Sequence, residues 1–178
     1  EFGGAGDARF AGVNDRIYFR RARIALSGSF AEHFDFKIEG DFGANSLSAG
    51  TGLRAQANEI FLNWNRYAVA NVRLGQLKPA FGAEQLMSDT KTPTIERFFA
   101  NDRLVDGRQL AIGLYGELPN KRVSYVLVVG QGNGSNVSTN DNNKFLTSLR
   151  VVGVAVDDKD AGKLTFGANA MHSEDNAI

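Results

Sequence analysis

Three arginines, Arg20, Arg21 and Arg23, lie close together near the start of the chain. A guanidinium group stays charged at physiological pH and presents a planar fork of N–H donors, which suits oxyanions. In a strand, Arg21 and Arg23 share one face, and Ile24 lies on the other. Arg20 falls in the register of Ile24. We therefore expect it at the border of the apolar surface, in a subunit contact, or turned inward by a β-bulge.

Acidic residues near these arginines give them a second interpretation. Glu39, Asp41 and Glu59 occur on the next two expected strands. Opposite charges on neighbouring strands neutralise one another. The pattern leaves two roles open for the arginines, an anion-binding path or a charge-balanced polar wall.

A long connection from Pro79 to Gly107 carries a second set of charges. It contains too many apolar side chains for a solvated linker, so we expect an ordered loop that packs against the rest of the molecule. Lys91 is expected either to contact a solute or to remain a solvated loop charge. Glu96 and Arg97 are expected to clamp the loop to its wall, because buried charges persist when they are paired.

Other residue types exclude several functions. The 20 Lys and Arg balance the 20 Asp and Glu, so the net charge says nothing about nucleic acid or an anionic membrane, and any electrostatic function depends on placement. We expect no nucleic-acid partner. The chain has no cysteine and hence neither disulfide nor thiolate chemistry. His33 and His172 lack a second histidine or a serine at useful spacing. We expect no catalytic residue, metal site or cofactor, and no enzyme activity.

Period-two alternation of apolar and polar residues recurs along the chain and predicts an all-β fold. The clearest case is the segment 34–42, where Phe34, Phe36 and Ile38 alternate with charged residues. Amphipathic helix patterns do not persist outside the long loop. Strands are expected at residues 16–29, 34–42, 58–65, 69–78, 108–118, 122–130, 146–156 and 163–173.

The connections between these strands alternate in length, which favours a membrane barrel. Antiparallel strands of about ten residues, with short turns at one end and long loops at the other, are typical of outer-membrane barrels. A soluble β-sandwich is the alternative, but it has no reason to segregate loop lengths. Short connections are expected at 31–33, 66–68, 119–121 and 157–162, and long ones at 44–57, 79–107 and 131–143.

We therefore predict an antiparallel transmembrane β-barrel with about eight strands in this chain. Residues 1–178 form one domain, and the third loop, 79–107, folds inward as a constriction loop. A narrow barrel is filled by its own side chains, whereas a wide one accommodates a folded-in loop. The chain is thus expected to be part of a larger barrel.

Six short stretches follow one another in a fixed order: YFRRARI at 18–24, FDFKIE at 34–39, DF at 41–42, GQLKPAFG at 75–82, EQLMS at 84–88 and IER at 95–97. Their order and spacing resemble the amino-terminal half of the phosphate-selective porin O and P family of the bacterial outer membrane. The resemblance covers most of the chain and rests on the series, because no single stretch is specific.

The resemblance implies a 16-stranded barrel, about the size of known porins, that is a homotrimer in outer-membrane lipid. Its inward loops and a ladder of arginines draw anions to a central lysine. Arg20 and Arg21 match two ladder arginines. The family's lysine position falls on Thr90, with Lys91 one residue later, and Asp89 makes this segment more acidic, which bears on selectivity for phosphate.

The expected function is that of a porin that passively conducts phosphate or related oxyanions. Arg20, Arg21, Arg23 and Lys91 are the expected lining of its constriction. One alternative is a non-conducting structural barrel that serves as a scaffold or partner in an envelope complex. A lipid-modifying barrel enzyme is a further alternative, which requires a serine or aspartate bonded to His172 in a cleft.

Overall fold

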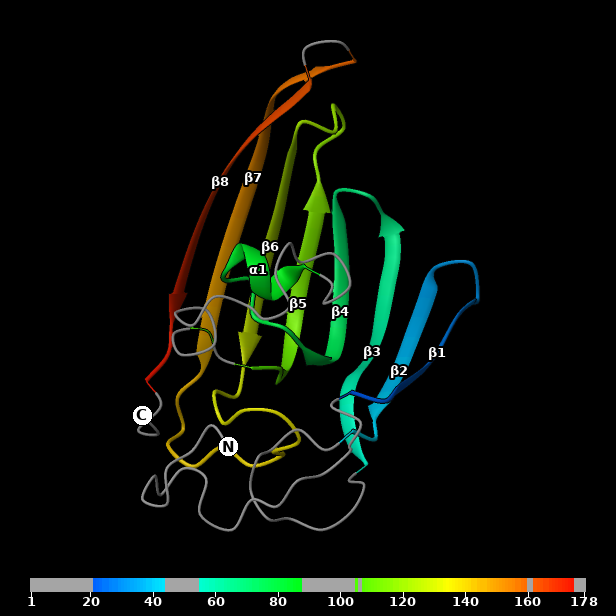
Figure 1. Cartoon of the computed structure of the whole chain (residues 1–178), viewed down its shortest axis with the longest axis vertical. Helices are drawn as coiled ribbons and strands as arrows, with labels where there is room; N and C mark the ends of the chain where they lie inside the picture. The colour runs from blue at the N-terminus through cyan, green and yellow to red at the C-terminus, as the bar shows by residue number, and fades with distance from the viewer. Residues whose placement is uncertain (1–20, 44–54, 88–104, 106, 160–161, 175–178) are drawn as a thin grey trace, which may run out of the picture.

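The computed structural model describes residues 21–43, 55–87, 105, 107–159 and 162–174. They form one antiparallel sheet in which each strand pairs with the next along the chain (Figure 1). The helix in this part of the chain, α1 at Ala83–Leu86, follows β4. The predicted all-β antiparallel fold is confirmed. The strands are β1 Arg23–Phe30, β2 Phe34–Asp41, β3 Gln56–Tyr67, β4 Ala70–Leu77, β5 Gln109–Glu117, β6 Val123–Gly130, β7 Leu146–Asp158 and β8 Gly162–His172.

The first strand begins later than predicted. Arg21 and Ala22 precede β1, and the residues before them lie outside the described part of the chain. Asp41 accounts for this start, because its carboxylate accepts hydrogen bonds from the backbone N–H groups of Ala22 at 3.1 Å and Gly43 at 2.9 Å. A side chain thus satisfies donors that a longer strand ladder would otherwise occupy.

The sheet has two chemically different faces, because successive side chains of a strand point to opposite sides. We call the face that carries Lys37 the inner face and the face that carries Ile38 the outer face. On the outer face, Ile24 is 70% exposed and Ile112 is 56% exposed. Apolar surface on this scale needs an apolar partner. Within the described ranges, no helix has the length and hydropathy needed to cross a bilayer.

Short and long connections lie at opposite ends of the sheet, as predicted. Figure 1 shows the β3–β4 and β5–β6 turns at the upper end and the β6–β7 connection, residues 131–145, at the lower end. In the β1–β2 turn, Ala31 and Glu32 adopt the left-handed conformation, with φ of 48° and 61°, which matches the twist of a tight hairpin. Near the β3–β4 turn, the rings of Trp64 and Tyr67 meet edge to face, 5.8 Å apart.

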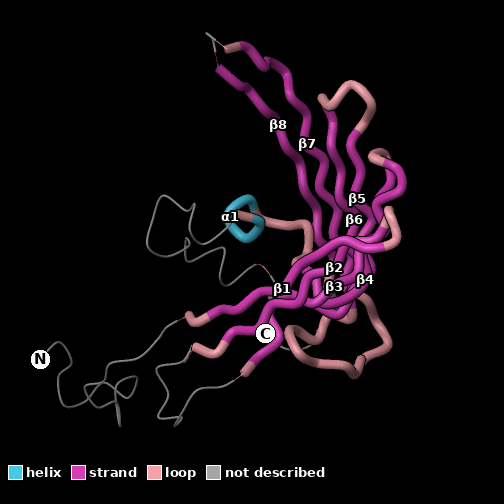
Figure 2. Tube along the Cα trace, turned by 90° about the vertical axis from the view of Figure 1, so that its right-hand side faces the viewer, coloured by secondary structure: helices cyan, strands magenta, loops and turns pink. Residues whose placement is uncertain are grey.

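The start of the third loop folds onto the inner face. Figure 2 shows the sheet curving around the side on which α1 lies. Ala80 is fully buried against Leu77, Ala111 and Val128, and its backbone N–H donates to Ser148 Oγ on β7 at 2.8 Å. Small and apolar residues of β5 and β6 therefore form the surface on which this part of the loop packs.

The connection from β6 to β7 is tied to the end of β8. The Lys144 ammonium forms an ion pair with the Glu174 carboxylate, and Asn142 Nδ2 donates to the Glu174 backbone oxygen at 2.9 Å. Hydrogen bonds from Lys144 and then His172 hold the pKa of the Glu174 carboxyl below its usual range. The carboxylate is thus ionised at neutral pH, and this contact weakens only as the pH falls through the lowered pKa.

Replacing Ser148 by alanine tests whether its hydrogen bond with Ala80 holds the start of the third loop on the inner face. The Ala80 N–H then loses its partner in a buried position, at a cost of about 1 kcal/mol. We expect amide hydrogen exchange of the segment around Ala80 to become about fivefold faster, measured by mass spectrometry. The control is Thr147→Ala, which alters the neighbouring residue on the outer face. Equal exchange in both variants would show that the bond does not hold the loop.

Candidate functional site

Paired charges line the inner face of β2 and β3. Glu39 and Glu59 are direct partners across these strands, an arrangement that is unfavourable for like charges without a shared cation. Lys37 supplies the cation, with its Nζ atom 2.7 Å from Glu39 and 2.8 Å from Glu59. Arg108 Nε lies 3.7 Å from Glu59 on the other side. This part of the wall is therefore neutral overall.

The expected site residue Arg23 lies on the inner face but is paired. Its Nε donates to Asp41 Oδ2 at 2.9 Å, and the two residues are direct partners across β1 and β2. Arg23 therefore fits the neutralised-wall interpretation. Arg21 is exposed and precedes β1. The remaining expected residues, Arg20, Lys91, Glu96 and Arg97, lie outside the described part of the chain, so their roles stay predictions.

Arg73 on β4 also lies on the inner face, but aromatic rings hold it in place of a carboxylate. Its guanidinium lies between two aromatic rings, 4.6 Å from the centroid of Phe61 and 4.2 Å from that of Tyr115. Its Nε donates to Asn63 Oδ1 at 3.4 Å. Within the described part of the chain, no carboxylate forms an ion pair with it. Aromatic faces attract a cation without neutralising it, so Arg73 keeps its charge for another partner.

A glycine on the next strand makes room for this arrangement. Arg73 is the direct partner of Gly113 on β5, and a Cβ atom at Gly113 would lie 2.5 Å from the Tyr115 ring. The missing side chain lets the ring lie over the backbone beside Arg73. The position of the guanidinium thus depends on the identity of a residue 40 positions away in the sequence.

Two hollows of the inner face meet at Arg73. The first, of about 340 Å³, lies over β1 to β4 and includes Asp35 and Lys37. The second, of about 190 Å³, lies beneath α1 and includes Tyr115, Lys78 and Leu86. A solute that moves along this face from one hollow to the other passes the guanidinium.

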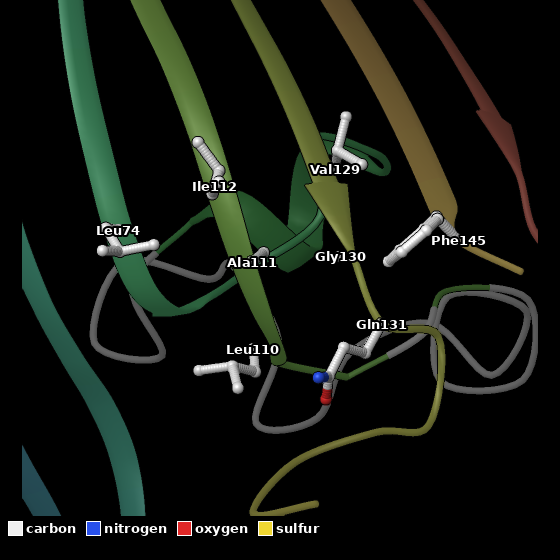
Figure 3. Close-up of a pocket in the computed structure, with 8 residues that line it drawn as sticks. All are labelled: Leu74, Leu110, Ala111, Ile112, Val129, Gly130, Gln131 and Phe145. Atoms are coloured by element: carbon white, nitrogen blue, oxygen red, sulfur yellow. The ribbon is translucent and has the colours of Figure 1, made fainter. Parts of the chain in front are cut away.

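A third hollow, of about 370 Å³, lies on the outer face (Figure 3). Figure 3 shows the side chains of Leu110, Ile112, Val129 and Phe145 projecting on the side of the sheet away from α1. Gln131 at its rim is the polar side chain among its lining residues. This hollow suits hydrocarbon and offers nothing to hold an ion, in contrast to the two inner hollows.

The sequence-based prediction missed Arg73, although the signal was present. Val72 and Leu74 are apolar and flank it, so period-two alternation places Arg73 on the polar face. A single arginine between apolar residues is a weaker sequence signal than the cluster of Arg20, Arg21 and Arg23. Within the described residues, no group of three or more acidic or histidine side chains is arranged to hold a metal ion.

A curved antiparallel sheet with an apolar outer face, a charged inner face and loops of unequal length defines part of an outer-membrane channel wall. The family model for phosphate-selective porin O and P matches residues 4–148, and the chain belongs to this family. Its members are outer-membrane channels rather than enzymes. No curated protein matches the chain.

Replacing Lys37 by methionine tests the charge network. Glu39 and Glu59 then face each other without their shared cation, and the free energy of unfolding in detergent should fall by about 1–2 kcal/mol, measured by urea denaturation. The control is Lys163→Met, which removes one partner of the exposed pair with Asp157 and should change stability by less than about 0.5 kcal/mol. Similar effects of the two variants would contradict a structural role for Lys37.

Proposed function

We propose that this chain forms part of a porin that passively conducts phosphate or related oxyanions through a basic constriction. The observation that carries the proposal is Arg73, a cation on the inner face held by two aromatic rings and by Asn63. Conduction requires sites that bind weakly enough to release the ion. One guanidinium beside an open hollow meets this requirement.

The constriction loop is residues 79–107, and its start is seated on the inner face by Ala80. Arg20, Arg21 and Lys91 complete the proposed lining together with Arg73. Arg23 belongs to the wall, where it positions Asp41. It acts on a passing anion through the electric field of the Arg23–Asp41 ion pair. Glu96 and Arg97 clamp the loop.

The remaining features of the proposal concern assembly. A sheet edge in a membrane must be paired, because its backbone groups find no water there. β1 and β8 are the edges of the described sheet. Further strands complete a 16-stranded barrel, a size that leaves an aqueous channel. The barrel is a homotrimer surrounded by outer-membrane lipid, and its partners are phosphate-like anions.

A non-conducting scaffold is the second candidate function. It is favoured by the neutral wall of β1 to β3, where Arg23 and Lys37 are both bound to carboxylates. In that case the inner face is a polar filling, and the barrel serves as a partner in an envelope complex.

Single-channel recording of the full-length protein in a planar bilayer tests the proposal. We expect a small anion-selective chloride current that phosphate blocks, and Arg73→Gln should weaken the block about tenfold, the value of one charge-assisted hydrogen bond. The control is Arg66→Gln, which also removes an arginine stacked on a tyrosine, at 5.6 Å from the Tyr67 ring.

Two other outcomes would contradict the proposed conduction path. A current that is unselective, or whose phosphate block is the same in Arg73→Gln and wild type, excludes the Arg73 path. Absence of any current from the folded protein favours the scaffold.

A further inference from the structure

The hollow over β1 to β4 also contains a carboxylate that, within the described part of the chain, forms no direct ion pair. Asp35 accepts hydrogen bonds from three neutral side chains, Ser29 at 2.8 Å, Asn63 at 3.2 Å and Asn65. None of the ion pairs formed by the described residues includes Asp35. The same hollow is lined by Arg73, whose charge is likewise uncompensated by a direct ion pair. An anionic group and a cationic group thus line the same open hollow.

Asn63 keeps these opposite charges apart. Asp35 is the direct partner of Asn63 across β2 and β3, and Asn63 is the direct partner of Arg73 across β3 and β4. The Asn63 amide donates to the Asp35 carboxylate and accepts from the Arg73 guanidinium. Two hydrogen bonds and one amide group therefore span the gap, which is at most about 9 Å.

Other charged residues of this wall, unlike Asp35 and Arg73, form direct ion pairs. Arg23 and Asp41 are direct cross-strand partners and form an ion pair. Lys37, which also lines the hollow, is held by two carboxylates. In contrast to these ion pairs, the row through Asn63 presents opposite charges that are separated. Such a row favours a solute that itself carries two opposite charges at a matching distance.

We propose that this hollow is a subsite for zwitterionic phosphate monoesters, in which a phosphate group and an ammonium group are separated by a short carbon chain. The inference rests on the proposed anion-conducting function. The phosphate contacts Arg73, whose fork of donors matches its oxygens, and the ammonium contacts Asp35. Ser29, the β1 partner of Asp35, also lines this hollow, and its hydroxyl donates to the Asp35 carboxylate and holds it in place.

The dimensions agree with this occupant. A bent two-carbon spacer, with one hydrogen bond of about 2.8 Å at each end, fits the span between the two charged groups. The hollow of about 340 Å³ leaves space for water around such a solute. An ion pair in a water-exposed site is weak, so the solute is selected without being trapped.

The experiment compares two solutes of nearly the same shape, O-phosphoethanolamine and ethyl phosphate, which lacks the ammonium group. Each is titrated against the single-channel current of the full-length protein at neutral pH. In the wild type, we expect O-phosphoethanolamine to block at about fivefold lower concentration, the value of one solvated ion pair. Asp35→Asn should remove this difference and leave the block by ethyl phosphate as strong or stronger. Arg73→Gln should weaken the block by both solutes.

Asp157→Asn is the control for Asp35→Asn, because it removes an exposed carboxylate elsewhere in the sheet and should keep the fivefold preference. The circular dichroism spectrum verifies that each variant is folded, and calorimetric titration of both solutes in detergent gives the same comparison independently of conductance. Equal binding of the two solutes by the wild type, or a preference that persists in Asp35→Asn, overturns the inference while anion conduction stands. A wild type without anion-selective current, which binds neither solute, overturns the proposed function itself.

Discussion

Strict alternation of side chains along each strand is the constraint on which the rest of this structure depends. Most outer-face residues are apolar, and many are exposed, as Ile24 and Ile112 are, while the residues between them form the inner face with its charged groups. A strand pairs its backbone groups only with its neighbours, so a slip of one residue would bring charges to the outer face. Charge pairs on the inner face favour the same register, because partners such as Arg23 and Asp41 meet only when the strands are aligned in this way.

The inner face is itself divided into two regions with different tasks. Over β1 to β4 it is charged and hollowed, and over β5 to β7 it carries a patch of small residues. Ala111, Val128 and Ser148 belong to the second region, where Ala80 of the third loop is seated. Arg73 lies at the border between these regions. Its guanidinium contacts the ring of Phe61 on β3 and the ring of Tyr115 on β5. The start of the third loop, at Ala80, thus packs on this patch, next to the charged hollow that Arg73 lines.

Much of this architecture could be predicted from the sequence, because alternation and loop length are local patterns. The eight strands, the two faces and the unequal ends all follow from such patterns, and the short series of matching stretches indicated the family. Partner choice among charges could not be predicted in the same way. Arg23 is neutralised because the register sets it opposite Asp41, and Arg73 stays available because Gly113 lies opposite it. Both facts depend on pairings between strands, which alternation alone does not specify.

The ring pair of Trp64 and Tyr67 has an optical consequence. Trp64 is the one tryptophan of the chain, and it lies at the end of the sheet where the short turns gather. Aromatic rings at this level of a membrane barrel are placed at the boundary between hydrocarbon and headgroups. The intrinsic tryptophan fluorescence of this chain therefore reports the polarity at one rim alone. Its emission maximum follows the arrival of that rim at the lipid interface during insertion, separately from events in the constriction.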